Sequence, residues 1–354
     1  MTRSDHAVVP PSRRGAERDG SLSGMERALT QALDPLLPRG VRCALLEFPD
    51  YGNVGDSAIW LGEKAYLQRI GARVVYSCDR HGYSAAKLAQ RLRDGVILLQ
   101  GGGNLGDLWP QYQHFREQVI AAFPHNRVVQ LPQSVWFEDK ASLDRARAVF
   151  DAHPDLTLLI RDERSLEFAR REFKTPSFLC PDMSIALGPL PRARRPRQDV
   201  LWLLREDGEA RDHGASLAGV ESEDWGSEQR SWRFRLKRSV AEELSWHPRS
   251  PGWTWPLLAP VHNRVWDSLA RERLARGCEV LGRGRVVITD RLHGHLLSLL
   301  LGIPHVVLGD RHGKVRNYYE TWTRTCGVAP WAQTREEAAT LALRLAGTEP
   351  HGCA

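Results

Sequence analysis

Short apolar runs alternate with amphipathic stretches over most of this 354-residue chain. An apolar run bounded by turn residues is typical of a buried strand, and apolar residues that recur every three or four positions are typical of a helix covering a sheet. The predicted strands are 42–48, 73–77, 96–100, 127–131, 156–160, 200–204, 285–289 and 305–308. The predicted helices are 57–70, 84–93, 111–123, 139–152, 163–172, 262–276, 293–301, 314–323 and 335–346. This alternation predicts an α/β protein with largely parallel, doubly wound sheets.

A segment rich in proline and arginine, 189–198, interrupts the alternation. We interpret it as a linker between an N-terminal Rossmann-like domain, 25–188, and a C-terminal Rossmann-like domain, 199–346, which face each other across a cleft. Residues 1–24 contain almost no apolar side chains and are expected to form a disordered tail.

Composition and charge narrow the class of protein. With 42% hydrophobic and 26% charged residues, the chain has the composition of a soluble globular protein. It has neither an apolar run of about 20 residues, as a membrane span requires, nor a secretory leader, so a cytoplasmic protein is expected. The six cysteines are scattered without a CxxC pair, and no metal is expected. A net charge of +6 favours anionic partners, but no interleaved basic and aromatic motif predicts nucleic-acid binding.

Charged residues follow two of the predicted C-terminal strands. Arg291 and His293 come directly after strand 285–289, at the beginning of a helix. Open α/β sheets bind anions at this position, because the carboxyl ends of strands meet helix N-termini there. Lys314 follows Gly313 after the next strand, and such a pair can supply a phosphate with backbone N–H groups and a charge. The alternative for both segments is an ordinary turn with solvated charges.

The first predicted strand is followed by Asn53, Gly55 and Asp56, where a helix begins. Asn53 and Asp56 are candidates to contact a substrate hydroxyl, with Asp56 placed to deprotonate it. The alternative is that Asp56 or Ser57 only caps the helix.

Three glycines, Gly101, Gly102 and Gly103, follow strand 96–100 and are succeeded by Asn104. With Gly106 they satisfy the pattern GxGxxG. A dinucleotide site also needs an acidic residue at the end of the next strand. Here that strand ends in Leu131-Pro132-Gln133, and none of these residues is acidic. We therefore interpret the run as a loop that lets another group approach closely or that binds an anion. A tight turn is the alternative.

Arg161 directly follows strand 156–160 and is expected to point toward the same sheet edge as the glycine run. The planar guanidinium suits a bidentate contact with phosphate or carboxylate. An ion-pair cluster with Asp162 and Glu163 at a helix start is the alternative.

These motifs together resemble the polysaccharide pyruvyl transferase family, in particular its exopolysaccharide-biosynthesis branch. The matching segments occur in the family's order: 53–63 (NVGDSAIWLGE), 100–109 (QGGGNLGDLW), 131–135 (LPQSV), 161–165, 181–184 (PDMS) and 283–309. Residues 310–313 depart from the family pattern, and 206–258 match little beyond Asp224-Trp225.

The resemblance implies a GT-B-like fold and the transfer of pyruvate from phosphoenolpyruvate onto two hydroxyls of one sugar, which makes a cyclic ketal. It implies a donor site of Arg161, Arg291 and His293, to which we add Gly102, Gly103, Asn104 and Lys314. His293 is expected to be the general acid, Arg291 to stabilise departing phosphate, and Asp56 to be a base that binds the acceptor together with Asn53. No cofactor is expected.

The acceptor is expected to be a sugar in a glycan or lipid-linked oligosaccharide for a cell-surface polysaccharide, with peripheral contact at the inner face of the membrane. One alternative is a GT-B glycosyltransferase with a nucleotide-sugar donor. Another is a non-catalytic glycan- or anion-binding protein in an assembly complex. Tryptophans such as Trp225, Trp253, Trp255 and Trp266 are candidates to stack on sugars, with core packing as the alternative.

Overall fold

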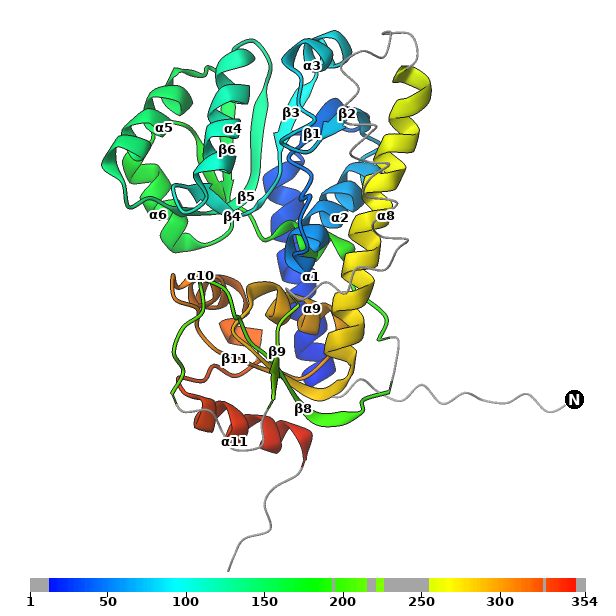
Figure 1. The fold of residues 1–354 in the computed structure, drawn as a ribbon, viewed down its shortest axis with the longest axis vertical. Coiled ribbons are helices and arrows are strands. Elements are labelled where there is room, and N and C mark those ends of the chain that lie inside the picture. Colours follow the sequence, from blue (N-terminus) through cyan, green and yellow to red (C-terminus); the bar gives the residue numbers. More distant parts are fainter. Residues whose placement is uncertain (1–12, 193–194, 215–220, 226–254, 327–328, 348–354) are drawn as a thin grey trace, which may run out of the picture.

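The computed structural model describes residues 13–192, 195–214, 221–225, 255–326 and 329–347 (Figure 1). Within these ranges the chain forms an α/β protein with two separate parallel sheets. No helix in the described part is both long enough and apolar enough to cross a bilayer. The α/β class and the parallel sheets predicted from the sequence are confirmed.

The first sheet has strand order β2-β1-β3-β5-β6-β7, with β4 paired to β5 beyond the end of β3, and every pairing is parallel. Its strands are β1 (Arg42–Leu46), β2 (Arg73–Cys78), β3 (Val96–Leu99), β4 (Gly102–Gly106), β5 (Val128–Trp136), β6 (Leu156–Ile160) and β7 (Ser177–Leu179). Its helices are α2 (Val54–Arg69), α3 (Ala85–Leu92), α4 (Pro110–Ala122), α5 (Lys140–Ala152) and α6 (Glu163–Glu172), and the 3-10 helix η1 (Met183–Leu187) follows β7.

The second sheet is smaller, with strand order β11-β10-β8-β9, again all parallel. Its strands are β8 (Gln198–Leu203), β9 (Ser222–Glu223), β10 (Gly284–Thr289) and β11 (His305–Val307). The helices are α8 (Trp255–Gly282), α9 (Leu292–Leu301), α10 (Lys314–Tyr318) and α11 (Arg335–Ala346). A π-helix, Tyr319–Thr323, and the 3-10 helix η3 (Arg324–Cys326) continue from α10.

The prediction of a disordered tail over 1–24 is wrong from residue 13 onward, because α1 spans Arg13–Leu33; residues 1–12 lie outside the described part. Leu22, Met25, Leu29 and Leu33 of α1 are buried at helical spacing. In Figure 1, α1 runs past both sheets, and it contacts both η1 and the π-helix. This helix is stabilised by tertiary packing, which a local composition does not reveal.

The two sheets share one hydrophobic core, and each sheet also has a buried cluster of its own. A single cluster of buried side chains includes Leu45 and Val129 of the first sheet together with Leu203 and Val287 of the second, joined through helices α1, α2, α8 and α9. The long helix α8 packs on both α2 and α9 and runs beside both halves in Figure 1. The domain boundaries at 25–188 and 199–346, and the GT-B-like arrangement, therefore stay predictions.

The expected linker, 189–198, is held against the second half. The Leu190 amide donates to Leu300 O, and the Arg192 guanidinium donates to Gly282 O, 3.2 Å away. The chain then enters β8 at Gln198, two residues before the predicted strand.

Candidate active site

A cavity of about 480 Å³ lies where the carboxyl ends of strands from both sheets meet. Its wall is built by the residues that follow β1, β6, β8, β9, β10 and β11, together with β4 and the start of α4. The lining residues include Asn53, Asp56, Gly103, Asn104, Arg161, Arg291, His293 and Lys314. All the predicted site residues except Gly102 therefore border one cavity, and Gly102 lies directly behind it, close to Asp56.

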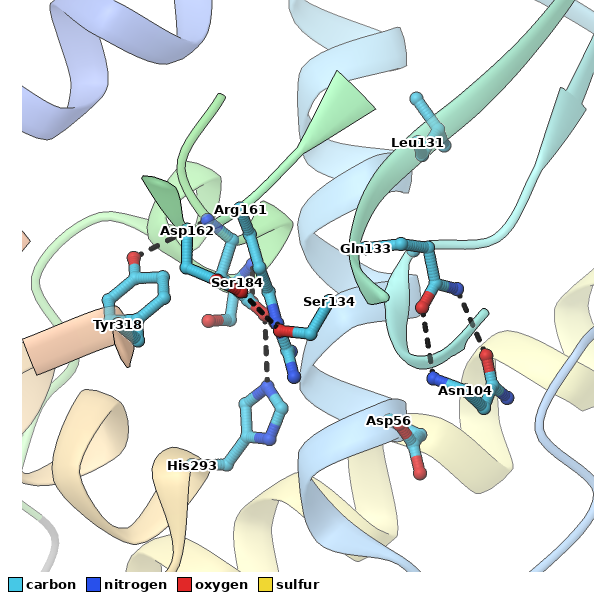
Figure 2. Close-up of polar contacts among 12 residues, drawn as sticks. Asp56, Asn104, Leu131, Gln133, Ser134, Arg161, Asp162, Ser184, His293 and Tyr318 are labelled. Atoms are coloured by element: carbon cyan, nitrogen blue, oxygen red, sulfur yellow. Dashed lines mark hydrogen bonds and ion pairs between the residues drawn. The ribbon is translucent and has the colours of Figure 1, made fainter. Parts of the chain in front are cut away.

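Arg161 is held rigidly beneath this cavity (Figure 2). Its Nε donates to Ser134 Oγ and its Nη1 to Asp182 Oδ2, both at 2.9 Å. Ser134 in turn donates to Asp162, the N-cap of α6, at 2.7 Å. With one edge of the guanidinium fixed in this way, Nη2 points toward Gly103 and the cavity.

Gly103 permits this approach. A methyl group at that position would lie 2.5 Å from Arg161 Nη2 and 3.5 Å from Lys314 Cδ. The predicted loop after β3 is wrong in detail, because residues 102–106 form strand β4. A glycine was also predicted to let another group approach closely, and at Gly103 the group that does so is the Arg161 guanidinium. Gly102 and Gly106 have φ values of +141° and +126°, which favour glycine.

His293 stands between the buried carboxylate of Asp182 and the half-buried carboxylate of Asp56. Its Nε2 is 3.4 Å from Asp182 Oδ2, while its Nδ1 lies against Gly55, where a methyl group would come within 2.2 Å. Figure 2 shows the imidazole below Arg161, with Asp56 on the side of α2. Burial opposes ionisation of Asp182, but the charges of His293 and Arg161 and their hydrogen bonds hold the pKa of Asp182 well below its usual range.

Asp56 has the opposite electrostatic environment. Burial raises the pKa of Asp56, and the charge of His293 together with a hydrogen bond from Tyr51 offsets that rise only in part. Asp182 is thus an ionised partner for the imidazole, and Asp56 is the more basic carboxylate. Asn53 is the N-cap of α2 and accepts a bond from the Gly55 amide at 2.9 Å, so the alternative of a helix cap at Asp56 or Ser57 is wrong.

Arg291 faces the cavity from the second sheet, but it is already bonded to carboxylates. Its Nη2 donates to Asp224 and, at 3.2 Å, to Asp207. Its buried Nε has no hydrogen-bond partner among the described residues. Within the described part of the chain, this Nε is therefore left without an acceptor.

Two further cations continue this wall. Arg205 pairs with Asp207 and Glu209, and Lys314 Nζ lies 3.1 Å from Glu209 Oε1. Burial lowers the pKa of Lys314 and the charges of Arg161 and Arg205 add to the effect, while Glu209 opposes it. The second sheet thus presents alternating charges, and an incoming anion would compete with these carboxylates or share their partners.

Asn104 is fixed from behind by buried polar groups. Its Oδ1 accepts from Arg116 Nη2 at 2.6 Å and from Gln133 Nε2 at 3.0 Å. Arg116 also pairs with the buried Glu47, 2.9 Å away. Asn104 is therefore a rigid part of the wall.

Sequence reasoning assigned no role to several residues now found at the site. Asp182 lies behind Arg161, and Asp224 follows β9. The others line the cavity: Arg205, Asp207 and Glu209 follow β8, and Tyr51, Trp109 and Tyr112 belong to the first half of the chain. Of the four tryptophans considered for sugar stacking, Trp225 lines the cavity and Trp266 is buried in the core. Trp253 and the side chain of Trp255 lie outside the described residues. Within the described ranges, no three potential metal ligands are grouped together.

A cavity lined by charged side chains at the carboxyl ends of parallel strands is the usual position of a ligand site in an α/β protein. The sequence comparison makes the class specific: the chain belongs to the polysaccharide pyruvyl transferase family, whose profile matches residues 53–312. The protein is thus a transferase.

Curated relatives agree with this family. The chain is 36% identical to pyruvyl transferase 1 of Schizosaccharomyces pombe, over 85% of this chain and 75% of that protein. It is 31% identical to the pyruvyl transferase EpsO of Bacillus subtilis, over 85% of this chain and 91% of EpsO. A crystal structure of an uncharacterised Klebsiella pneumoniae protein is similar in fold, with a TM-score of 0.56 at 16% identity, covering 87% of this chain and 98% of that one.

Proposed function

We propose that the protein transfers pyruvate from phosphoenolpyruvate to two hydroxyls of one sugar in a cell-surface or exopolysaccharide precursor, forming a cyclic ketal. The observation that carries this proposal is the convergence of Arg161, His293 and Lys314 on one cavity from three different strand ends. Phosphoenolpyruvate carries a phosphate and a carboxylate on one small carbon frame. Two anionic groups so close together need several cations within a few ångströms, as this cavity provides.

In this scheme His293 protonates the methylene carbon of phosphoenolpyruvate, which places positive character on the central carbon. Asp182 holds the Nε2 side of the imidazole, so the proton leaves from Nδ1, on the side of Asp56. Arg161 and Lys314 stabilise the phosphate as its bond to the central carbon breaks. The free Nε edge of Arg291 adds a donor from the opposite wall.

Asp56 takes the proton of the first sugar hydroxyl as that oxygen attacks the central carbon. The second hydroxyl closes the ring after phosphate has left. One of the two hydroxyl protons replaces the proton that the enzyme gave to the methylene carbon, which has become the methyl group of the ketal. The other hydroxyl proton leaves with phosphate. The products are the pyruvyl ketal and inorganic phosphate, so atoms and charges balance without a cofactor.

Donor binding tests the proposal most directly. Phosphoenolpyruvate at a hundred-fold excess over its Kd should stabilise the folded protein by about 2.7 kcal/mol, measured as a thermal shift. UDP and GDP-mannose serve as comparisons. Stabilisation by a nucleotide but not by phosphoenolpyruvate would make the protein a glycosyltransferase and contradict the proposal.

Variants then locate the donor. Arg161→Lys should lose the shift, because a point charge cannot keep the bonds to Ser134 and Asp182 while also facing the cavity. His293→Ala should keep a folded protein and lower turnover by on the order of 10²–10⁴. Near-normal turnover by a folded His293→Ala variant would remove His293 as the acid.

The acceptor is proposed to be a glycan or lipid-linked oligosaccharide, reached at the cytoplasmic face of a membrane. The net charge of +6 supports contact with an anionic surface. Sedimentation with anionic vesicles, compared with neutral ones, tests this part separately.

A further inference from the structure

The cavity has a second end with different chemistry. The lining residues of the segments 50–56 and 109–112 are Asp50, Tyr51, Asn53, Asp56, Trp109, Gln111 and Tyr112. Among these named residues the only charged side chains are two carboxylates. We call these seven residues the aromatic end of the cavity.

Three contacts hold the aromatic end together. The rings of Tyr51 and Tyr112 meet edge to face, with centroids 6.0 Å apart, and the Tyr112 amide donates to Trp109 O at 3.0 Å. Tyr51 also lies near enough to Asp56, the proposed base, to lower the pKa of its carboxyl group. The aromatic end therefore adjoins the position where the proposed attack on the donor takes place.

Trp109 is the unusual member of this group. The exposed large hydrophobic side chains among the described residues are Trp109, Phe178 and Leu343, and of these three only Trp109 lines the cavity. Its side chain is 45% exposed, so a wide apolar face meets solvent at the mouth of the site.

The local structure presents this ring at some cost to the helix. Trp109 occupies the N-cap of α4 and makes no side-chain cap bond, whereas caps usually carry Ser, Thr, Asp or Asn. Pro110 follows at the first helical position and disfavours a helical backbone at Trp109, which has φ −131° and ψ 72°. A rigid indole at a cavity mouth, at a position suited to a small polar residue, is the arrangement of a binding platform.

We propose that the acceptor is an uncharged pyranose that lays its C–H face on Trp109, with the hydroxyls to be bridged directed at Asp56. This proposal rests on the proposed function, because phosphoenolpyruvate then occupies the cationic end. A uronic acid or phosphorylated sugar is disfavoured, because its charge would lie near Asp50 and Asp56. The rest of the glycan leaves the site past the exposed edge of Trp109.

The experiment uses p-nitrophenyl glycosides of glucose, galactose and mannose, with the glucuronide as the charged comparison, each supplied with phosphoenolpyruvate. Phosphate release and a mass gain of pyruvate less water report turnover. At least one neutral glycoside should be accepted, and the glucuronide should not.

Three variants assign the effect to the ring. Trp109→Ala should raise KM for the accepted glycoside about ten-fold, the loss of one stacked aromatic contact, with KM for phosphoenolpyruvate unchanged. Trp109→Phe should recover most of the loss. Phe178→Ala is the matched control, because Phe178 is equally exposed at 47% but lies on β7 away from the cavity.

The outcomes separate this inference from the function on which it rests. If phosphoenolpyruvate fails to stabilise the protein, the proposed function itself is wrong. If it stabilises the protein but Trp109→Ala keeps the wild-type KM, or only the glucuronide or no glycoside is accepted, the inferred acceptor site is wrong and the donor assignment stands.

Discussion

At the scale of single residues, the site depends on glycines that leave room for charged groups. Gly103→Ala should place a methyl group 2.5 Å from Arg161 Nη2 and displace the guanidinium, while the backbone at this position needs no left-handed conformation. Because overpacking typically costs about 1–3 kcal/mol, phosphoenolpyruvate affinity should fall about ten-fold or more. Calorimetric titration measures this loss. Gly24→Ala, a helical glycine with no neighbour within 4 Å, should leave affinity unchanged, and equal affinities in both variants would contradict the assignment.

Asp182 is the second residue whose replacement should be decisive. It is buried between Arg161 and His293, so Asp182→Asn leaves the buried guanidinium of Arg161 without its carboxylate and removes the charged partner of the His293 imidazole. Removing one partner of a buried ion pair costs about 3–5 kcal/mol, and turnover should also fall on the order of a hundred-fold. Chemical denaturation and phosphate release measure the two effects. The exposed pair Arg127–Asp155 offers the control Asp155→Asn, for which a change of at most about 1 kcal/mol is expected.

The sequence reveals some of these residues and hides others for a physical reason. Arg161, Arg291, His293 and Lys314 each lie in the segment that follows a strand with a clear apolar run, so their place at the sheet edge could be predicted. Asp182 follows β7, which has only three residues and no such run. The residues after β8 lie in a stretch without periodicity, and their mutual pairing depends on folding of the whole second half.

At the scale of elements, a buried pair of histidines joins α9, β11 and the π-helix. His305 Nδ1 donates to Ile303 O, so its Nε2 accepts from His295 Nδ1 at 2.7 Å, and His295 Nε2 accepts from Thr323 at 2.8 Å. This chain requires both rings to be neutral. Burial lowers the pKa of His305 to about 4 and that of His295 well below its usual range.

Acid should therefore destabilise the protein in a defined range of pH. The unfolded chain binds protons at these histidines near pH 6.5, whereas the folded chain resists protonation of His305 down to about pH 4. The free energy of unfolding therefore keeps its full value above pH 6.5 and falls as the pH drops toward 4. His305 alone accounts for a loss of roughly 3 kcal/mol. Denaturation midpoints measured between pH 4 and pH 6.5 test this prediction. The variant His305→Gln should be less stable at neutral pH, but its stability should depend less steeply on pH. An unchanged slope in that variant would exclude the histidine as the cause.

Element prediction from the sequence succeeds where packing and local pattern agree. Helices such as α5 and α6 begin at Asp139 and Asp162, whose side chains cap them, and both were located within a residue. Helix α1 was missed, because its first half is rich in arginine, glycine and serine and carries few apolar side chains. Strand β4 was interpreted as a loop, because glycines carry no side-chain pattern at all.

At the scale of the whole molecule, the shared core predicts how the protein unfolds. Because one buried cluster connects both sheets through α1, α2, α8 and α9, unfolding of one sheet should expose the part of this cluster that belongs to the other sheet. Scanning calorimetry should show one transition, with calorimetric and van't Hoff enthalpies equal. Two resolved transitions would instead support two independent domains divided near 189–198.

The distribution of the cavity wall along the chain has a consequence for engineering. The cationic residues are spread from Arg161 to Lys314 and are locked together by ion pairs, so none can be exchanged alone. The aromatic end comes from two short segments, 50–56 and 109–112. A chimaera that receives only these two segments from a relative would inherit a new sugar preference and retain the original donor chemistry.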